Sequence, residues 1–284
     1  MIVFDGRLNE SGTVAFDLSD RGLTLGDGLF ETMLAVDRRV FRRVAHLDRM
    51  MGGAAAFAIP VTRERLESDL DLLLATLPDG VEVIRLAVTR GPGGRGLRRP
   101  ETARPTVIVT HAPWSADPVM RPVRLVTSTI RRNETSPAAR WKTSAYVDAI
   151  AALAEAEAKG ADDALLLNMR GDVACTTSGN IFAIEGDVLL TPQTDDGILD
   201  GTTRGLVLEL ARTMGLRTKE MSLKPIEFAT AEALFLTNSV RLINPVVGLD
   251  RRRHDAGHPV IGRLCDAIGA RIAAECGRDP RAVG

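Results

Sequence analysis

Lysine is scarce in this chain, and one lysine stands where it could form a covalent bond with a cofactor or substrate. Only four of the 36 basic residues are lysines. A lysine that must form an imine cannot be replaced by arginine, because guanidinium stays protonated and is not a nucleophile at neutral pH. Lys142, in the string Arg-Trp-Lys-Thr-Ser at 140–144, is therefore a candidate nucleophile. Taken alone, the position is more typical of a solvated lysine at the start of a helix. Other parts of the sequence must therefore show whether Lys142 is catalytic.

Three strings in the second half of the chain suit a bound phosphate group. Residues 199–204, Leu-Asp-Gly-Thr-Thr-Arg, form a turn that runs into a helix. The free N–H groups of a helix start, with two hydroxyls beside them, suit a phosphate dianion. Residues 236–239 end a strand with three small polar side chains, and residues 171–182 form a polar hairpin arm. Each string alone is also typical of a capped helix or a turn.

Length and composition describe a soluble globular protein. The 284 residues can bury one large core or two modest ones, and 26% are charged and 45% hydrophobic. The formal charge of −1 gives no basic excess that would indicate nucleic acid binding. No apolar stretch approaches the roughly 20 residues that span a bilayer, and the first residues lack the pattern of a signal peptide. We expect a cytoplasmic protein with no membrane or nucleic-acid partner.

The cysteines and histidines predict no metal site. The three cysteines are an odd number without metal-like spacing, which favours free thiols in a reducing compartment. Among the four histidines, His254 and His258 lie in a polar stretch with no cysteine nearby. We therefore expect chemistry that needs no metal ion.

Hydrophobic periodicity predicts α+β structure in both halves of the chain. Thr62 is placed to cap a helix, and Pro113 and Pro118 indicate an interdomain linker around 111–119. The predicted strands are 2–4, 28–36, 39–41, 81–89, 105–110, 123–128, 164–168, 181–184, 188–191 and 233–237, and the predicted helices are 46–57, one from 62 onward, 146–158, 202–214 and 259–276.

These features occur together in one known family. With Lys142, the chain resembles the class IV aminotransferases, the fold-type IV pyridoxal-phosphate enzymes. The family includes branched-chain and D-amino acid aminotransferases, (R)-selective amine transaminases and 4-amino-4-deoxychorismate lyases. The resemblance covers nearly the whole chain and rests on strings that follow in the family's order. They are Ser-Asp-Arg-Gly at 19–22, Gly-Asp-Gly-Leu-Phe-Glu-Thr at 26–32, His-Leu-Asp-Arg at 46–49, the glycine-rich string at 89–96, and residues 160–165, 178–182, 191–192, 197–204 and 244–246.

The resemblance implies which residues hold pyridoxal 5′-phosphate. Lys142 would bind the cofactor as an imine and then carry the Cα proton as acid and base. Arg49 matches the family's phosphate-binding arginine. Thr202 and Thr203 match positions whose backbone and hydroxyls hold the same phosphate, and Ser239 matches a further phosphate contact.

The resemblance also implies two substrate-binding residues. Arg95 falls where D-amino acid aminotransferases place an arginine for the substrate carboxylate, a task that suits the fork-shaped guanidinium. Its neighbours Arg98 and Arg99 leave open that Arg95 is only a solvated loop residue. Phe30 stands where several relatives have a tyrosine, and Leu97 replaces a histidine that pairs with the carboxylate-binding arginine.

One position departs from the family pattern. The family places a glutamate five residues before the asparagine matched by Asn180, where it keeps the pyridine nitrogen of the cofactor protonated, but this chain has Cys175. A protonated ring is the stronger electron sink, and a thiol is a weak, neutral hydrogen-bond partner. We expect slow aminotransfer, or a reaction that needs less carbanion stabilisation, unless a nearby acid or a water takes over the glutamate's role.

The sequence therefore predicts two α+β domains, residues 1–111 and a pseudo-barrel at 121–284, joined by a linker at 112–120. The family implies a cofactor in the cleft between them and a homodimer.

The leading function is pyridoxal-phosphate-dependent transfer of an amino group between an amino acid or primary amine and a 2-oxo acid, with D-amino acids favoured by Arg95. One alternative is a 4-amino-4-deoxychorismate lyase that releases pyruvate, since the strings at 90–96 and 237–239 look closest to that branch. Another is a cofactor-binding protein of low activity, because of Cys175.

Overall fold

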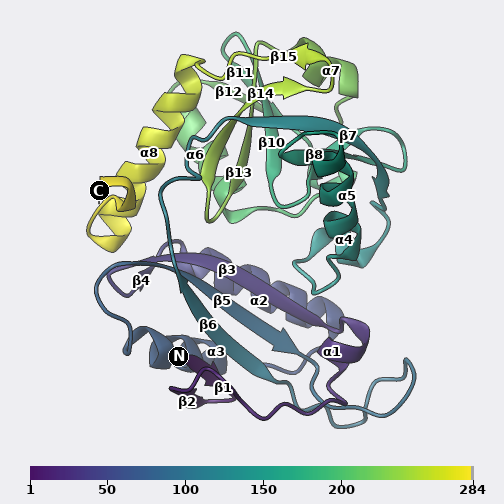
Figure 1. Ribbon diagram of the computed structural model, residues 1–284, viewed down its shortest axis with the longest axis vertical. Coiled ribbons are helices and arrows are strands. Elements are labelled where there is room, and N and C mark those ends of the chain that lie inside the picture. The colour runs from purple at the N-terminus through teal and green to yellow at the C-terminus, as the bar shows by residue number, and fades with distance from the viewer. Residues whose placement is uncertain (283–284) are drawn as a thin grey trace. The chain divides into compact units, whose positions relative to one another are not determined.

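The structure, a computed structural model, describes residues 1–282, which divide into two compact units (Figure 1). The first unit holds Met1–Ser115, Trp141–Ala145 and Ile272–Ala282, and the second holds Ala116–Arg140 and Tyr146–Arg271. The segment Trp141–Ala145 thus belongs with the first unit, although the residues on both sides of it belong to the second. The predicted division into two domains at a single linker, residues 112–120, does not include this return of the chain to the first unit.

An antiparallel sheet of six strands forms the centre of the first unit. The elements are β1 (Ile2–Phe4), β2 (Arg7–Asn9), α1 (Arg21–Leu25), β3 (Gly28–Val36), β4 (Arg39–Val40), α2 (Arg43–Phe57), α3 (Arg63–Leu74), β5 (Val81–Thr89) and β6 (Val107–Pro113). The strand order is β2-β1-β6-β5-β3-β4, and β3 pairs with β5 along its whole length. One face of the sheet packs against α2 and α3 through a core that includes Met33, Leu47, Leu66 and Leu70.

Local sequence sets the starts of the two long helices of this unit. Thr62 is extended, and its hydroxyl accepts from the backbone N–H of Arg65, so α3 begins where the sequence predicts. Helix α2 begins at Arg43, earlier than the predicted start at residue 46. Arg42 adopts a left-handed conformation there and turns the chain from β4 into the helix.

The second unit contains a mixed sheet of nine strands. Its elements are β7 (Val123–Arg132), α4 (Pro137–Arg140), α5 (Val147–Ala158), β8 (Asp163–Asn168), β9 (Val173–Thr176), β10 (Asn180–Glu185), β11 (Val188–Thr191), the short helix η1 (Thr194–Asp196), α6 (Thr202–Thr213), β12 (Arg217–Glu220), α7 (Pro225–Thr230), β13 (Ala233–Asn238), β14 (Leu242–Leu249) and β15 (Arg252–Arg253). Helix α8 (Pro259–Cys276) begins in this unit, and its last residues, from Ile272, belong to the first unit together with η2 (Pro280–Ala282). The order is β12-β11-β10-β13-β14-β7-β8-β9, with β15 paired to β14. Phe182 and Phe235, opposite one another on β10 and β13, stack with ring centroids 4.9 Å apart.

Most predicted elements are present, with some bounds shifted. The strand predicted at 105–110 runs from Val107 to Pro113 and so enters the segment expected to be a linker, because these residues continue the pairing with β5. Nothing in the sequence pattern predicts β14, since Pro245 removes a hydrogen-bond donor from its centre, yet the strand forms with Pro245 opposite Phe235. No helix within residues 1–282 is both long and apolar enough to cross a membrane.

Candidate active site

Lys142 lies on a short segment that extends the first sheet at the start of β3. The N–H of Phe30 donates to the Lys142 carbonyl at 2.9 Å, and the N–H of Ser144 donates to the Gly28 carbonyl at 3.0 Å. This antiparallel pairing places the Lys142 and Phe30 side chains on the same face. The Lys142 Nζ accordingly lies 4.5 Å from the centroid of the Phe30 ring. The candidate nucleophile is thus half-buried and tied to a strand, and it does not stand at a helix start.

A second cation, Arg85, shares the Phe30 ring. The Arg85 Cζ lies 3.8 Å from the ring centroid, and Phe30 itself is only 6% exposed. The strand register explains the contact, because Thr32 is opposite Arg85 and Phe30 is therefore its diagonal neighbour on the same face. Aromatic faces attract cations, so the ring holds both positive groups close to one location that suits an anionic substrate. Sequence reasoning missed Arg85, since only the register of β3 and β5 could reveal it.

Arg49 is paired with a buried carboxylate, Glu31, whose side chain leaves β3 on the face opposite to Phe30. Two nitrogens of Arg49 donate to the two carboxylate oxygens of Glu31 at 2.8 and 2.6 Å. His46 Nδ1 lies 2.7 Å from the same carboxylate. Glu31 is 1% exposed, and this alone would raise its pKa. The hydrogen bonds from Arg49 and His46 outweigh the burial and lower the pKa of Glu31 to about 2.

The protonation of His46 follows from the same cluster. Burial lowers the pKa of His46, and the nearby charges of Arg49 and Lys142 act in the same direction, against the opposing effect of Glu31. A neutral His46 therefore donates its Nδ1–H to an ionised Glu31. Sequence reasoning placed Glu31 and His46 in family strings but gave neither a role, because their pairing depends on how α2 packs on β3.

The other predicted phosphate-binding residues gather at the start of α6 in the second unit. Gly201 precedes the helix and supplies no side-chain cap, so the first N–H groups have no partner within the helix. The hydroxyls of Thr202 and Ser239 lie 3.2 Å apart. Thr202 and Thr203 are 8% and 6% exposed. The structure therefore brings Ser239 into contact with Thr202, from which it is 37 positions away in the sequence.

Two details of this helix start fit a phosphate group. A Cβ at Gly201 would lie 2.1 Å from Oδ1 of Asn180, whose amide also donates to the Leu199 carbonyl, so glycine lets Asn180 fix the turn before α6. Thr237, opposite Asn180 in the sheet, has a buried hydroxyl without a hydrogen-bond partner. Because buried polar groups are nearly always paired, this hydroxyl and the helix start fit an oxygen-rich anion such as the cofactor phosphate.

Cys175 lies on β9 as a free thiol that is 6% exposed. It packs in an apolar cluster with Ala152, Ala164 and Ile198. Burial raises the pKa of Cys175, and the positive charge of Arg132 offsets this only in part. The side chain is therefore neutral at neutral pH and cannot supply the negative charge of the family's glutamate.

Arg95 lies exposed on the long loop between β5 and β6. The buried Arg21 fixes part of this loop, since its guanidinium donates to the carbonyls of Gly96, Leu97 and Arg98 at 3.1, 3.2 and 3.2 Å. The loop therefore has a defined conformation next to Arg95. A role for Arg95 as a carboxylate ligand stays a prediction.

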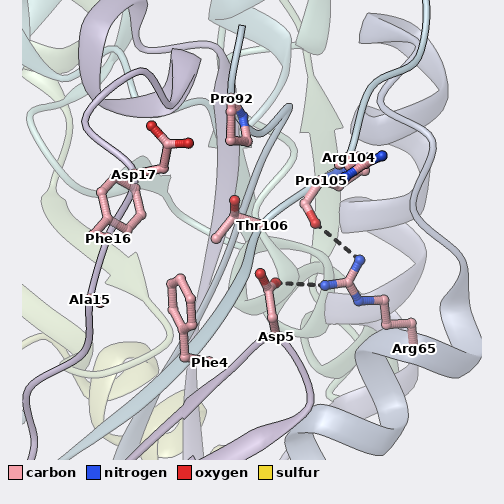
Figure 2. Close-up of a pocket in the computed structure, with 10 residues that line it drawn as sticks. All are labelled: Phe4, Asp5, Ala15, Phe16, Asp17, Arg65, Pro92, Arg104, Pro105 and Thr106. Atoms are coloured by element: carbon pink, nitrogen blue, oxygen red, sulfur yellow. Dashed lines mark hydrogen bonds and ion pairs between the residues drawn. The ribbon is translucent and has the colours of Figure 1, made fainter.

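The first unit also contains a cavity of about 520 Å³ that shares no residue with the predicted site (Figure 2). Phe4 and Phe16 contribute apolar surface to it. Arg65 donates to the Asp5 carboxylate at 2.6 Å and to the Pro105 carbonyl at 3.0 Å, the two contacts that are dashed in Figure 2. Because Arg65 is already paired within the protein, we assign no chemistry to this cavity.

Comparison with known proteins assigns the chain to a family. The family described as amino-transferase class IV matches residues 28–249, and the chain belongs to it. The protein named “Putative branched-chain-amino-acid aminotransferase” from Methanocaldococcus jannaschii is 33% identical over 259 residues, which cover 88% of each chain. Curated relatives named aminodeoxychorismate lyase and D-alanine aminotransferase match as well.

Solved structures agree with this assignment. A 4-amino-4-deoxychorismate lyase from Pseudomonas aeruginosa is similar with a TM-score of 0.85 and 29% identity, over 95% of this chain and 98% of that chain. A hypothetical aminotransferase from Mycobacterium tuberculosis, in a form with bound pyridoxal phosphate, is similar with a TM-score of 0.85 and 25% identity, over 96% of this chain and 99% of that chain. The predicted fold-type IV class is confirmed. The prediction of pyridoxal phosphate, the cofactor of class IV aminotransferases, is confirmed with it.

Proposed function

We propose that this chain is an aminotransferase that moves an amino group between an amino acid or primary amine and a 2-oxo acid. The observation that carries the proposal is the placement of Lys142. Its segment is hydrogen-bonded to β3, and its amine lies over the Phe30 ring with Arg85 close by. An amine held in this way can meet a carbonyl group at a defined position, as covalent catalysis requires.

Two other lysines of the chain have different surroundings. Lys159 pairs with Glu155 at 2.7 Å, and Lys224 pairs with Asp172 at 2.5 Å. Each of these amines is therefore already engaged with a carboxylate of its own unit. Lys142 is held by main-chain hydrogen bonds to β3 beside Phe30 and Arg85, and this placement supports it as the residue that attaches the cofactor.

The proposed site residues divide the work by their chemistry. Lys142 would attach the cofactor covalently and carry a proton to and from the substrate Cα. Arg49, the hydroxyls of Thr202, Thr203 and Ser239, and the amides at the start of α6 would hold the phosphate. When bound, pyridoxal phosphate supplies the electron sink that lets the Cα proton leave.

The substrate carboxylate has two candidate partners. Arg95 matches the D-amino acid aminotransferases, and on this match we propose D-amino acids as donors. Arg85 is a second candidate that emerges from the geometry, because its exposed guanidinium lies against Phe30 near Lys142. Phe30 would form an apolar wall of the substrate site.

Cys175 would make the proposed reaction slow. A neutral thiol is a weak partner for the ring nitrogen of the cofactor, and Arg132 adds positive charge nearby. Both effects oppose protonation of that nitrogen and so weaken the electron sink. A cofactor-binding protein of low activity is the limiting case of this effect.

A lyase that releases pyruvate from aminodeoxychorismate is the second candidate function. It is favoured by the 29% identity to the lyase of known structure and by the strings at 90–96 and 237–239. The same lysine and the same phosphate-binding residues would serve both reactions. The two candidates differ in whether the cofactor accepts the amino group of a simple amino acid.

One spectral experiment tests the proposal. Purified protein is mixed with pyridoxal phosphate, and the yellow absorption band of the protein-bound cofactor is followed while D-amino acids, L-amino acids and (R)-amines are added singly. We expect an aminotransferase to convert the band with its donor, and borohydride to abolish it by fixing the cofactor on Lys142. In Lys142→Arg, turnover should fall on the order of 10⁴-fold or more, because the nucleophile is lost.

Two outcomes would count against this function. A band that no amino donor converts, together with pyruvate release from aminodeoxychorismate, would favour the lyase. Borohydride fixation on another lysine, or an unchanged turnover in Lys142→Arg, would contradict the role of Lys142 itself.

A further inference from the structure

The residue before Lys142 fits a notch in helix α2. Trp141 packs against the core of the first unit, and its ring lies over two consecutive glycines. A Cβ at Gly52 would lie 2.8 Å from two carbon atoms of the Trp141 ring. A Cβ at Gly53 would lie 3.4 Å from the same ring and 3.0 Å from Leu29. The indole therefore occupies space that any other residue at position 52 would take.

The notch matters because side chains alternate along the segment. Trp141 and Thr143 point toward α2, and Thr143 is only 7% exposed, while Lys142 points to the opposite face with Phe30. A shift of the indole would therefore tilt the backbone that carries the lysine amine. The segment is short, and two main-chain hydrogen bonds join it to β3. The Lys142 carbonyl accepts one of them, and the Ser144 N–H donates the other.

We infer that Trp141, seated in the notch at Gly52 and Gly53, is a positioning residue that fixes the direction of the Lys142 amine. This inference rests on the proposed role of Lys142 in attaching the cofactor. The main-chain bonds set where the segment lies along β3, and the indole sets how it is rotated about that strand. Catalysis by an amine requires both, because a displacement of about 1 Å can cost on the order of a hundredfold in rate.

The test uses the small number of lysines. Pyridoxal phosphate is added to the purified protein, borohydride fixes it after graded times, and peptide masses give the labelling rate at Lys142, Lys159, Lys219 and Lys224 separately. Gly52→Ala should slow labelling of Lys142 about tenfold and Gly52→Val about a hundredfold, with the other three lysines unchanged. The three other lysines show in the same sample whether the whole protein has been disturbed.

Gly262→Ala is the matched control. Gly262 also lies within a helix and is also half-buried, but a Cβ there meets nothing within 4 Å. In Gly262→Ala the labelling rates of the four lysines should equal those of the unaltered protein. Should Gly52→Val fail to fold, Trp141→Leu removes the indole without adding bulk and should slow labelling of Lys142 about tenfold.

A second readout follows the indole itself. The chain has two tryptophans, so in a Trp114→Phe background the emission reports Trp141 alone. Gly52→Val should shift this emission as the ring leaves the notch. The inference is overturned if the emission shifts while Lys142 labels at its original rate, or if the emission does not shift at all. If Lys142 is not labelled preferentially in the unaltered protein, the proposed function fails instead.

Discussion

The two groups of residues proposed to hold phosphate are built in opposite ways. In the first unit Arg49 carries a full charge that Glu31 already balances through two hydrogen bonds. In the second unit Thr202 and Ser239 are neutral, and they lie at a helix start whose N-cap is a glycine. Arg49 is part of an ion-pair cluster in the folded chain, whereas the first amides of α6 have no acceptor within the helix.

This difference separates folding stability from cofactor binding. Breaking one side of a buried ion pair leaves an uncompensated charge, so changes at Glu31 should act first on folding. Neutral donors at a helix start carry no formal charge that the folded chain must balance. Changes there should therefore act mainly on cofactor affinity, and should lower the free energy of unfolding less than changes at Glu31.

The largest effect is expected from Glu31→Gln. The substitution leaves Arg49 facing a neutral amide inside the first unit, so we expect the free energy of unfolding to fall by about 3–5 kcal/mol. Urea unfolding in the absence of the cofactor measures it. Glu155→Gln is the control, because Glu155 also has a pKa lowered to about 2 but lies closer to solvent beside Lys159. If Glu31→Gln lowers the free energy of unfolding no more than Glu155→Gln does, the ion pairs of Glu31 do not stabilise the fold.

A smaller effect is expected from Gly201→Ala at the start of α6. The added Cβ would meet Oδ1 of Asn180 at 2.1 Å and must displace the turn that presents the first N–H groups. Loss of one hydrogen bond to a charged group costs about 1.5–3 kcal/mol, which corresponds to a rise in the Kd for pyridoxal phosphate of about ten- to a hundredfold. A spectral titration measures this Kd, with urea unfolding run beside it.

Gly205→Ala, on the same helix, is the matched control for that substitution. A Cβ at Gly205 meets nothing within 4 Å, so the Kd should stay unchanged, while the helix gains about 0.5–1 kcal/mol from the better helix former. Equal Kd values in the two variants would contradict a phosphate site at this helix start.

The sequence predicts several long elements with their bounds, because their patterns are local. The strands at 28–36 and 81–89 and the helix at 259–276 have the predicted bounds. Residue type makes Lys142 a candidate, because only four lysines occur, and the resemblance to the family selects it. Thr202, Thr203 and Ser239 were matched through family strings, and the structure places Thr202 and Ser239 in contact.

The contacts that surround Lys142 could not be predicted in the same way. Arg85 reaches Phe30 only through the register of two strands, and Glu31 meets Arg49 only through the packing of α2 on β3. The notch for Trp141 depends on a segment of the second half of the chain returning to the first unit. Such contacts join residues far apart in sequence, and no periodicity or motif records them.

Cys175→Glu tests a position that lies in neither group. A carboxylate there, near the charge of Arg132, would hold a proton on the ring nitrogen of the cofactor and strengthen the electron sink. We expect the half-reaction with an amino donor to accelerate about tenfold, which corresponds to about 1.4 kcal/mol in the barrier. Stopped-flow absorbance measures it, and Cys175→Gln controls for the larger side chain. An unchanged or lower rate would show that another group already supplies the charge.

The smallest effect is expected from a change in pH, which should alter the free energy of unfolding through the cluster around Glu31 and not through the start of α6. His46 has a pKa below its usual value of 6.5, because burial disfavours its charged form, so it stays neutral in the folded chain at pH values where the unfolded chain takes up a proton. The free energy of unfolding should therefore decline as the pH falls below about 6.5. Glu31, with a pKa of about 2 against 4.5, adds a further loss only below pH 4.5. Urea unfolding between about pH 7 and pH 5 should thus show a slope that His46→Asn reduces. The residues at the start of α6 include no group that titrates in this range, so a slope that persists in His46→Asn would place the sensitive group outside both regions.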